Sequence, residues 1–144
     1  MIDELTKALG IAVSAHEGQT DKAGKPYILH PLEVAAKQKT YEGVIVALLH
    51  DVVEDSEYTI EDLKKEGFPE NVIEAVQLLT HEKGVPYADY IKAIYRNKIA
   101  KSVKIADLTH NSDLSRLPVV TEKDIERNGK YERALSYLRT GRHL

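Results

Sequence analysis

One stretch decides the fold of this chain: Val44-Ile45-Val46-Ala47-Leu48-Leu49-His50-Asp51-Val52-Val53-Glu54-Asp55. Its apolar first half predicts a helix buried in the protein interior, and its second half carries four ionisable side chains. On such a helix His50 and Glu54 share one face. Asp51 and Asp55 share another face, about 100° away. Burying the apolar run therefore draws at least one pair inward, where a carboxylate is costly unless it is paired or bound to a metal.

The alternative interpretation of this stretch is an acidic helix end that faces water. The helix dipole disfavours carboxylates at a C-terminus, and this end carries Asp51, Glu54 and Asp55 without a basic neighbour. That composition favours a bound cation. An imidazole combined with carboxylates suits Mn²⁺, Fe²⁺ or Zn²⁺ better than Ca²⁺. A single ion would need further ligands from elsewhere in the chain.

The rest of the chain also shows helical patterns, and strand-like alternation never lasts long enough to predict a strand. Two segments, Thr59 to Asp62 and Thr121 to Asp124, resemble capping boxes. Prolines stand where helices are expected to start, at positions 31, 69 and 86, and residues 17–29 are expected to form a loop. Helices are predicted to begin near residues 2, 30, 41, 59, 69, 86, 98 and 121, the third running from about Tyr41 to Glu54. We therefore predict an all-α bundle of about seven or eight helices, forming one domain over residues 1–144.

Several of these helices have a predicted apolar face, among them the first and the last. The face of the first helix consists of Ile2, Leu5, Leu9, Ala12, Val13 and His16, and the face of the last includes Ile125, Leu135 and Leu138.

The composition limits the class of partner. A formal net charge of −3 gives no basic footprint for nucleic acid, and no apolar run approaches the roughly 20 residues of a membrane span. Cysteine is absent, and an acidic pair, Asp3-Glu4, stands where a secretory signal would carry basic residues. We therefore expect a cytoplasmic protein that binds a small molecule and neither nucleic acid nor membrane. The sequence carries no signal for an oligomeric state.

Two further side chains are candidate metal ligands. His30 stands at a predicted loop–helix junction, where a histidine before a proline is also a common helix cap or core residue. Asp107 lies between apolar residues inside a predicted helix, a position that suits either a buried salt bridge or a ligand. Each position is ambiguous alone, and their combination with the His50-Asp51 pair is far more specific.

Four segments carry a family resemblance. They are Ala15-His16-Glu17-Gly18-Gln19, Gly24-Lys25-Pro26-Tyr27-Ile28-Leu29-His30-Pro31, Leu48 to Asp55, and Val103-Lys104-Ile105-Ala106-Asp107 followed by Asn111. Together they resemble the motifs of the HD-domain metallophosphohydrolases. The finer similarity is to the hydrolase domain of the RelA/SpoT alarmone enzymes and to small alarmone hydrolases of the Mesh1 type, over about residues 10–140.

The resemblance implies a site and a reaction. Such enzymes usually bind Mn²⁺, with Fe²⁺, Zn²⁺ or Mg²⁺ as alternatives here, and release pyrophosphate from the ribose 3′ position of ppGpp or pppGpp. The implied metal ligands are His30, His50, Asp51 and Asp107. Glu54 and Asp55 match the catalytic acidic pair. Lys22 and Asn111 match substrate-side residues, to which we add Tyr131 as a further substrate-binding candidate.

Two positions depart from the family pattern. Asp21 stands where these enzymes often have the arginine that holds the guanine base, and Leu108 stands where they often have another arginine. The favoured function is hydrolysis of (p)ppGpp, with ppApp or NADPH as other possible substrates. A general nucleotide or phosphomonoester hydrolase and a non-catalytic nucleotide-binding regulatory module remain as alternatives.

Overall fold

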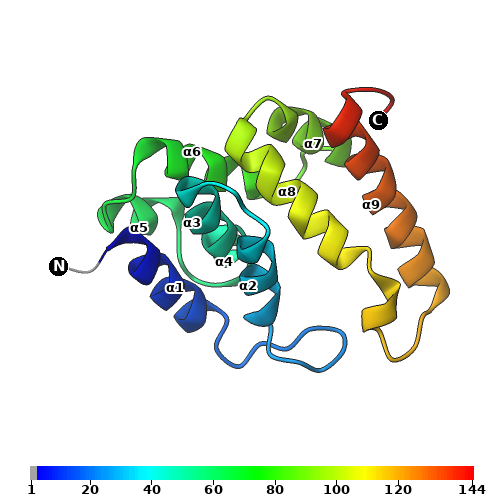
Figure 1. The fold of residues 1–144 in the computed structure, drawn as a ribbon, viewed down its shortest axis with the longest axis horizontal. Helices are drawn as coiled ribbons and strands as arrows, with labels where there is room; N and C mark the ends of the chain where they lie inside the picture. Colours follow the sequence, from blue (N-terminus) through cyan, green and yellow to red (C-terminus); the bar gives the residue numbers. More distant parts are fainter. Residues whose placement is uncertain (1–2) are drawn as a thin grey trace.

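The structure, a computed structural model, describes residues 3–144. Within these residues it contains α-helices, one short 3₁₀ helix and no β-strand (Figure 1). The α-helices are α1 (Glu4–Ala15), α2 (Leu29–Ala36), α3 (Tyr41–Leu49), α4 (Val52–Asp55), α5 (Ile60–Lys65), α6 (Glu70–Leu79), α7 (Tyr87–Tyr95), α8 (Lys98–Asn111) and α9 (Glu122–Thr140), and the 3₁₀ helix is η1 (Leu114–Arg116). The predicted all-α bundle is confirmed, with α4 as a single turn that continues α3. None of the described helices has the combination of length and apolar character needed to cross a membrane.

Helix α3 lies at the centre of the core. Every residue from Ile45 to Leu49 is buried, and α3 packs against α1, α2, α6 and α8. Burying a side chain the size of leucine or isoleucine contributes about 1.5–3 kcal/mol, so this run contributes substantially to core stability. Helix α9 packs on α7 and α8, on the side away from α1 (Figure 1).

The two capping boxes predicted at helix N-termini are confirmed. The Thr59 hydroxyl accepts a hydrogen bond from the Asp62 amide, and the Asp62 carboxylate accepts one from the Thr59 amide. Thr121 and Asp124 make the same reciprocal pair at the start of α9. Such a box satisfies backbone donors that the first helical turn otherwise leaves unpaired.

Four predicted features differ from the structure. Helix α2 begins at Leu29 rather than after His30, so Pro31 lies inside its first turn. On α1 the buried stripe is Ala8, Ile11 and Ala12, while Leu9 and Val13 of the predicted face are 38% and 52% exposed. Apolar residues surround much of α1, so periodicity alone could not identify the stripe that packs on α3. Ile2 of the predicted face lies outside the described residues.

Ile125 is the third difference, because it is 59% exposed rather than buried. The buried residues of α9 are Ala134, Leu135 and Leu138, all in its second half. The first half of α9 extends beyond the core and lies beside a cavity described below. Ile125, in this first half, therefore does not pack against the core.

The predicted continuous helix over 41–54 is wrong in one respect, because it breaks at His50-Asp51. Helix α3 ends at Leu49, Asp51 has φ −105° and ψ −2°, and α4 starts at Val52. In an unbroken helix adjacent side chains point about 100° apart. The break allows the side chains of His50 and Asp51 to converge instead, with Nε2 and Oδ2 3.1 Å apart.

Candidate metal centre

Four side chains that are distant in sequence converge at one point. His30 comes from α2, His50 and Asp51 come from the junction of α3 and α4, and Asp107 comes from α8. One ligand atom from each of the four lies within 4.8 Å of all the others. Because His30, His50 and Asp107 are buried and Asp51 is only partly exposed, the cluster is largely shielded from water.

The imidazole nitrogens face the carboxylate oxygens within this cluster. Nε2 of His30 lies 2.8 Å from Oδ1 of Asp107 and 3.8 Å from Oδ2 of Asp51. Nε2 of His50 lies 3.1 Å from Oδ2 of Asp51 and 3.5 Å from Oδ1 of Asp107. Two imidazoles and two carboxylates facing a common centre form a donor set suited to a divalent transition metal.

His50 shows most clearly that the cluster suits a metal. Its Nδ1 donates a hydrogen bond to the carbonyl oxygen of Ala47 at 2.5 Å, since a carbonyl can only accept. Its Nε2 is buried and makes no hydrogen bond to any described residue. Ligand histidines are commonly arranged this way, with one ring nitrogen held by a backbone carbonyl and the other directed at the metal. A buried polar atom without a partner is otherwise costly.

The electrostatics of the metal-free cluster also favour a positive charge at its centre. Burial lowers the pKa of His50, but the carboxylates of Asp51 and Asp107 outweigh it and raise that pKa well above 6.5. Burial raises the pKa of Asp107, but the Lys104 ammonium and the adjacent imidazoles of His30 and His50 hold it well below 3.8. The His50 charge likewise outweighs burial and lowers the pKa of Asp51. The carboxylates therefore stay ionised in a buried site.

Two side chains that the sequence did not single out support these carboxylates. The Tyr27 hydroxyl donates a hydrogen bond to Oδ2 of Asp51 at 2.5 Å. Burial and the nearby Asp51 charge raise the pKa of Tyr27, so this hydroxyl keeps its proton. Lys104, one turn before Asp107 on α8, lies 2.9 Å from Oδ2 of that residue. Both lie within quoted motifs, but only the fold shows which carboxylate each one contacts.

Glu54 and Asp55 lie on α4 and outside the four-residue cluster. The Glu54 carboxylate accepts a hydrogen bond from the backbone amide of His81. Burial, together with the charges of Asp51 and Glu54, raises the pKa of Asp55 to about 6. Asp55 is thus electrostatically coupled to the cluster, while Glu54 also anchors the segment that follows α6.

A cavity of about 300 Å³ adjoins the cluster. Its lining residues are Thr20, Asp21, Lys22, Ala23, Tyr27, Asn111, Asp113, Leu114, Arg116, Leu117, Asp124, Arg127, Asn128 and Tyr131. The structure brings together the three predicted substrate-side residues, Lys22, Asn111 and Tyr131, at this cavity. Tyr27 and Asn111 connect it to the cluster, since the Asn111 amide donates to Oδ1 of Asp107 at 3.0 Å and Tyr27 donates to Asp51.

The charged lining of the cavity includes Asp21, at the position that departs from the family pattern. Oδ1 of Asp21 accepts hydrogen bonds from the amides of Ala23 and Lys25, both at 2.9 Å, which stabilise the turn of its own loop. Oδ2 of Asp21 lies 3.6 Å from the guanidinium of Arg116, beyond α8. Asp21 therefore ties the loop to the opposite wall of the cavity. It is already engaged by protein groups.

The comparisons with known proteins agree with this geometry. A family described as "HD domain" matches residues 8–111. The chain is 36% identical over 125 residues to the bifunctional (p)ppGpp synthase/hydrolase SpoT of Escherichia coli, covering 76% of this chain and 18% of SpoT. It thus spans about a fifth of that relative's length. It is also 36% identical over 127 residues to the guanosine-3′,5′-bis(diphosphate) 3′-pyrophosphohydrolase MESH1 of Danio rerio, covering 78% of this chain and 69% of MESH1.

A solved structure has the same architecture. It is described as "A metazoan ortholog of SpoT hydrolyzes ppGpp and plays a role in starvation responses". The TM-score is 0.76 at 25% sequence identity, with 97% of this chain and 88% of that chain covered. The matched residues, the converged His/Asp cluster and the shared architecture together show that the chain is a member of the HD-domain family, to which the SpoT and MESH1 hydrolases also belong.

Proposed function

We propose that this protein is a metal-dependent phosphohydrolase that releases pyrophosphate from the ribose 3′ position of ppGpp or pppGpp. The observation that carries the proposal is the cluster of two histidines and two aspartates beside a cavity whose wall includes Lys22, Arg116 and Arg127 among other charged residues. The names of the SpoT and MESH1 relatives support the same reaction and substrate.

His30, His50, Asp51 and Asp107 would hold the metal, for which we propose Mn²⁺, with Fe²⁺, Zn²⁺ or Mg²⁺ as alternatives. Such an ion supplies Lewis acidity, which makes a water molecule more acidic and draws electron density from a phosphoryl oxygen. The protein keeps this site largely shielded from solvent, and Tyr27 and Lys104 keep the two carboxylates oriented.

Glu54 and Asp55 form the proposed proton-handling pair. In the hydrolysis, a water oxygen forms a bond to the phosphorus attached to the ribose O3′, and the bond between that phosphorus and O3′ breaks. The water loses a proton, and O3′ gains one to become the 3′-hydroxyl of the product. Asp55 suits the role of proton acceptor because its pKa of about 6 lies close to neutral pH, where a general base is most effective. Glu54 holds α4 against the segment at His81 and adds a second negative charge beside Asp55.

Lys22, Asn111 and Tyr131 would hold the nucleotide in the cavity. Lys22 offers an ammonium to a phosphate, Asn111 lies between the cavity and Asp107, and Tyr131 offers an aromatic face and a hydroxyl. Arg116 and Arg127 also line the cavity, where they pair with Asp21 and Asp124, and provide guanidinium groups for an anionic substrate.

The aspartate at position 21 is a reason to test a second candidate substrate beside ppGpp. With aspartate at this position the loop offers no arginine to hold a guanine base, and the carboxylate itself is engaged by two backbone amides and Arg116. The adenine analogue ppApp, or NADPH, therefore stands as the alternative substrate of the same chemistry. A broader nucleotide or phosphomonoester hydrolase and a non-catalytic nucleotide-binding module are the further alternatives.

A turnover profile tests the proposal. The purified protein is incubated with Mn²⁺ and, in separate reactions, ppGpp, pppGpp, ppApp, NADPH or simple nucleotides, and the released phosphate species are identified. The expected result is release of pyrophosphate from ppGpp, and a chelator should abolish that release. Orthophosphate from simple nucleotides would point to a general phosphohydrolase. Tight nucleotide binding without any product would point to a regulatory module.

We further propose that residues 1–144 act as one catalytic domain in the cytoplasm. A chain without cysteine is compatible with that reducing compartment, although it does not require one. Fractionation of cells that produce the native protein, followed by immunodetection, tests the location.

A further inference from the structure

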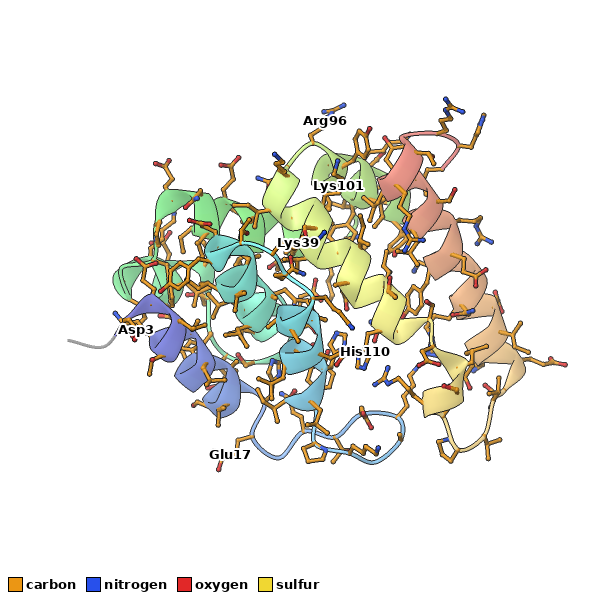
Figure 2. The ribbon with its side chains drawn as sticks, in the orientation of Figure 1. Asp3, Glu17, Lys39, Arg96, Lys101 and His110 are labelled. Carbon is orange, nitrogen blue, oxygen red and sulfur yellow. The ribbon has the colours of Figure 1, made fainter. Side chains whose placement is uncertain are left out.

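We propose that His110 is a positioning residue for the metal centre. It accepts a hydrogen bond from Nδ1–H of His30 and thereby keeps Nε2 of His30 free to bind the metal. This inference rests on the proposed metal-dependent function and extends it to a residue outside the ligand set. His110 lies near the end of α8, and Figure 2 shows its side chain in the space between α8 and α2.

The contact between the two histidines is short. Nδ1 of His110 lies 2.7 Å from Nδ1 of His30, and the two rings are nearly parallel, with an interplanar angle of 14° and centroids 5.0 Å apart. At this distance one nitrogen carries the proton and the other accepts it. The position of that proton determines which nitrogen of His30 has a free lone pair.

Metal binding determines the direction of this hydrogen bond. A metal at Nε2 of His30 requires an unprotonated nitrogen there, so a neutral His30 carries its proton on Nδ1. Nδ1 of His110 must then be the acceptor. Without a metal, Nε2 of His30 can instead donate to Oδ1 of Asp107, 2.8 Å away, and His110 can become the donor. The proposal therefore predicts that the donor and acceptor of the pair exchange roles when metal binds.

His30 differs from His50 in the kind of partner it has. The outer nitrogen of His50 is held by the backbone carbonyl of Ala47, which no substitution removes. The outer nitrogen of His30 is held by the side chain of His110, so its contribution can be measured directly. The His110 backbone carbonyl in turn accepts a hydrogen bond from Arg116 at 2.9 Å, which helps to keep the end of α8 in place.

His110 is only half-buried, and its ring forms part of the wall of an open groove between α2 and α8. Its removal therefore leaves no closed cavity in the core, and a large loss of fold stability is not expected. A positioning role for His110 can therefore be distinguished by experiment from a general packing role. Substitution should change the affinity for metal more than the stability of the metal-free protein.

The test compares His110→Leu with His110→Asn. Leucine removes the acceptor, while the side-chain oxygen of asparagine can replace Nδ1 at about the same distance from the backbone. Binding of Mn²⁺ to each metal-free protein is measured by calorimetric titration, alongside helical circular dichroism. We expect His110→Leu to bind Mn²⁺ about 10–100-fold more weakly, the usual effect of losing such an outer partner, and His110→Asn to recover most of that loss.

The control is Thr109→Ala, which changes the neighbouring exposed residue of α8, whose hydroxyl donates a hydrogen bond to the Ile105 carbonyl. Its Mn²⁺ affinity should equal that of the wild type. Wild-type affinity in His110→Leu, or equal losses in the leucine and asparagine variants, would overturn the inference. Binding of Mn²⁺ by the wild type without hydrolysis of any nucleotide would count against the proposed reaction alone. Absence of Mn²⁺ binding by the wild type would overturn both.

Discussion

The ammonium group of Lys104 lies 2.9 Å from Oδ2 of Asp107, while Oδ1 of the same carboxylate faces His30 at 2.8 Å. The two oxygens of Asp107 thus have different partners. One oxygen is held by a cation of the protein, and the other is directed at the candidate metal position. Both side chains are largely shielded, with 13% of Lys104 and 5% of Asp107 exposed. A buried pair of this kind leaves an uncompensated charge when one partner is removed.

Lys104→Met should destabilise the metal-free protein because it leaves the buried Asp107 carboxylate without its ammonium partner. We expect the free energy of unfolding to fall by about 3–5 kcal/mol. The measurement is denaturant unfolding in the presence of a chelator. Lys64→Met is the matched control, since Lys64 also pairs with a carboxylate three residues away, Glu61, but on the exposed surface. That change should cost about 0–1 kcal/mol, and equal effects of the two substitutions would contradict the prediction.

Substitution of a ligand should abolish metal retention without unfolding the protein. His50→Ala and Asp107→Ala each remove one of the four converging side chains, while the apolar core around α3 remains. We expect loss of bound metal and of activity together with wild-type helical circular dichroism. Metal content is measured by elemental analysis after dialysis. Full metal occupancy in both variants would show that the ligand assignment is wrong.

Glu54→Gln should lower kcat while leaving metal binding unchanged. The amide keeps an oxygen that can accept the hydrogen bond from the His81 backbone, so the substitution removes charge rather than shape. We expect kcat to fall by about 10²–10⁴, the range for a general acid–base group. Steady-state kinetics and thermal melts are measured together. An unchanged kcat with a lower melting temperature would instead assign Glu54 to anchoring α4 alone.

Asp55→Asn should stabilise the metal-free protein in a manner that depends on pH. The pKa of Asp55 is about 6 in the folded protein and 3.8 when unperturbed, so the folded state binds the proton more tightly and loses stability as pH rises between these values. Asparagine carries no charge to lose. The variant should therefore match the wild type near pH 4 and exceed it by about 1 kcal/mol at pH 7.5, after allowance for the partial exposure of Asp55. Equal stability at both pH values would contradict the prediction.

Local chemistry explains which parts of the fold were predictable. The reciprocal hydrogen bonds of Thr59 with Asp62 and of Thr121 with Asp124 involve residues three positions apart, so a short sequence window contains all of their partners. Asp51, at the break, instead contacts His30 of α2 and Tyr27 of the loop before α2, which are distant in sequence. The exposure of Ile125 likewise depends on where α9 extends past the core. The periodicity of apolar residues in the sequence shows neither the contacts between distant segments nor the point where a helix leaves the core.

The same distinction applies to the site. The sequence pointed to the four residues that converge, because a histidine and two aspartates beside apolar runs are costly when buried alone and because their order resembles a known family. Tyr27, Lys104 and His110 were not singled out. Each acts on a side chain from another element or another turn, and tyrosine, lysine and histidine at such positions are common for other reasons. Their partners become apparent only in three dimensions.

The contact between His30 and Asp107 joins residues that are 77 positions apart in the chain. A cation bound to both would act as a removable cross-link that closes a loop of this length. For a covalent link, loop-closure entropy alone would be worth about 4–5 kcal/mol, which sets an upper bound for a reversible one. The supply of metal would then govern the lifetime of the protein as well as its chemistry. Chelation should sensitise the segments between α2 and α8 to proteases, so that metal-starved cells clear this protein faster than metal-replete cells.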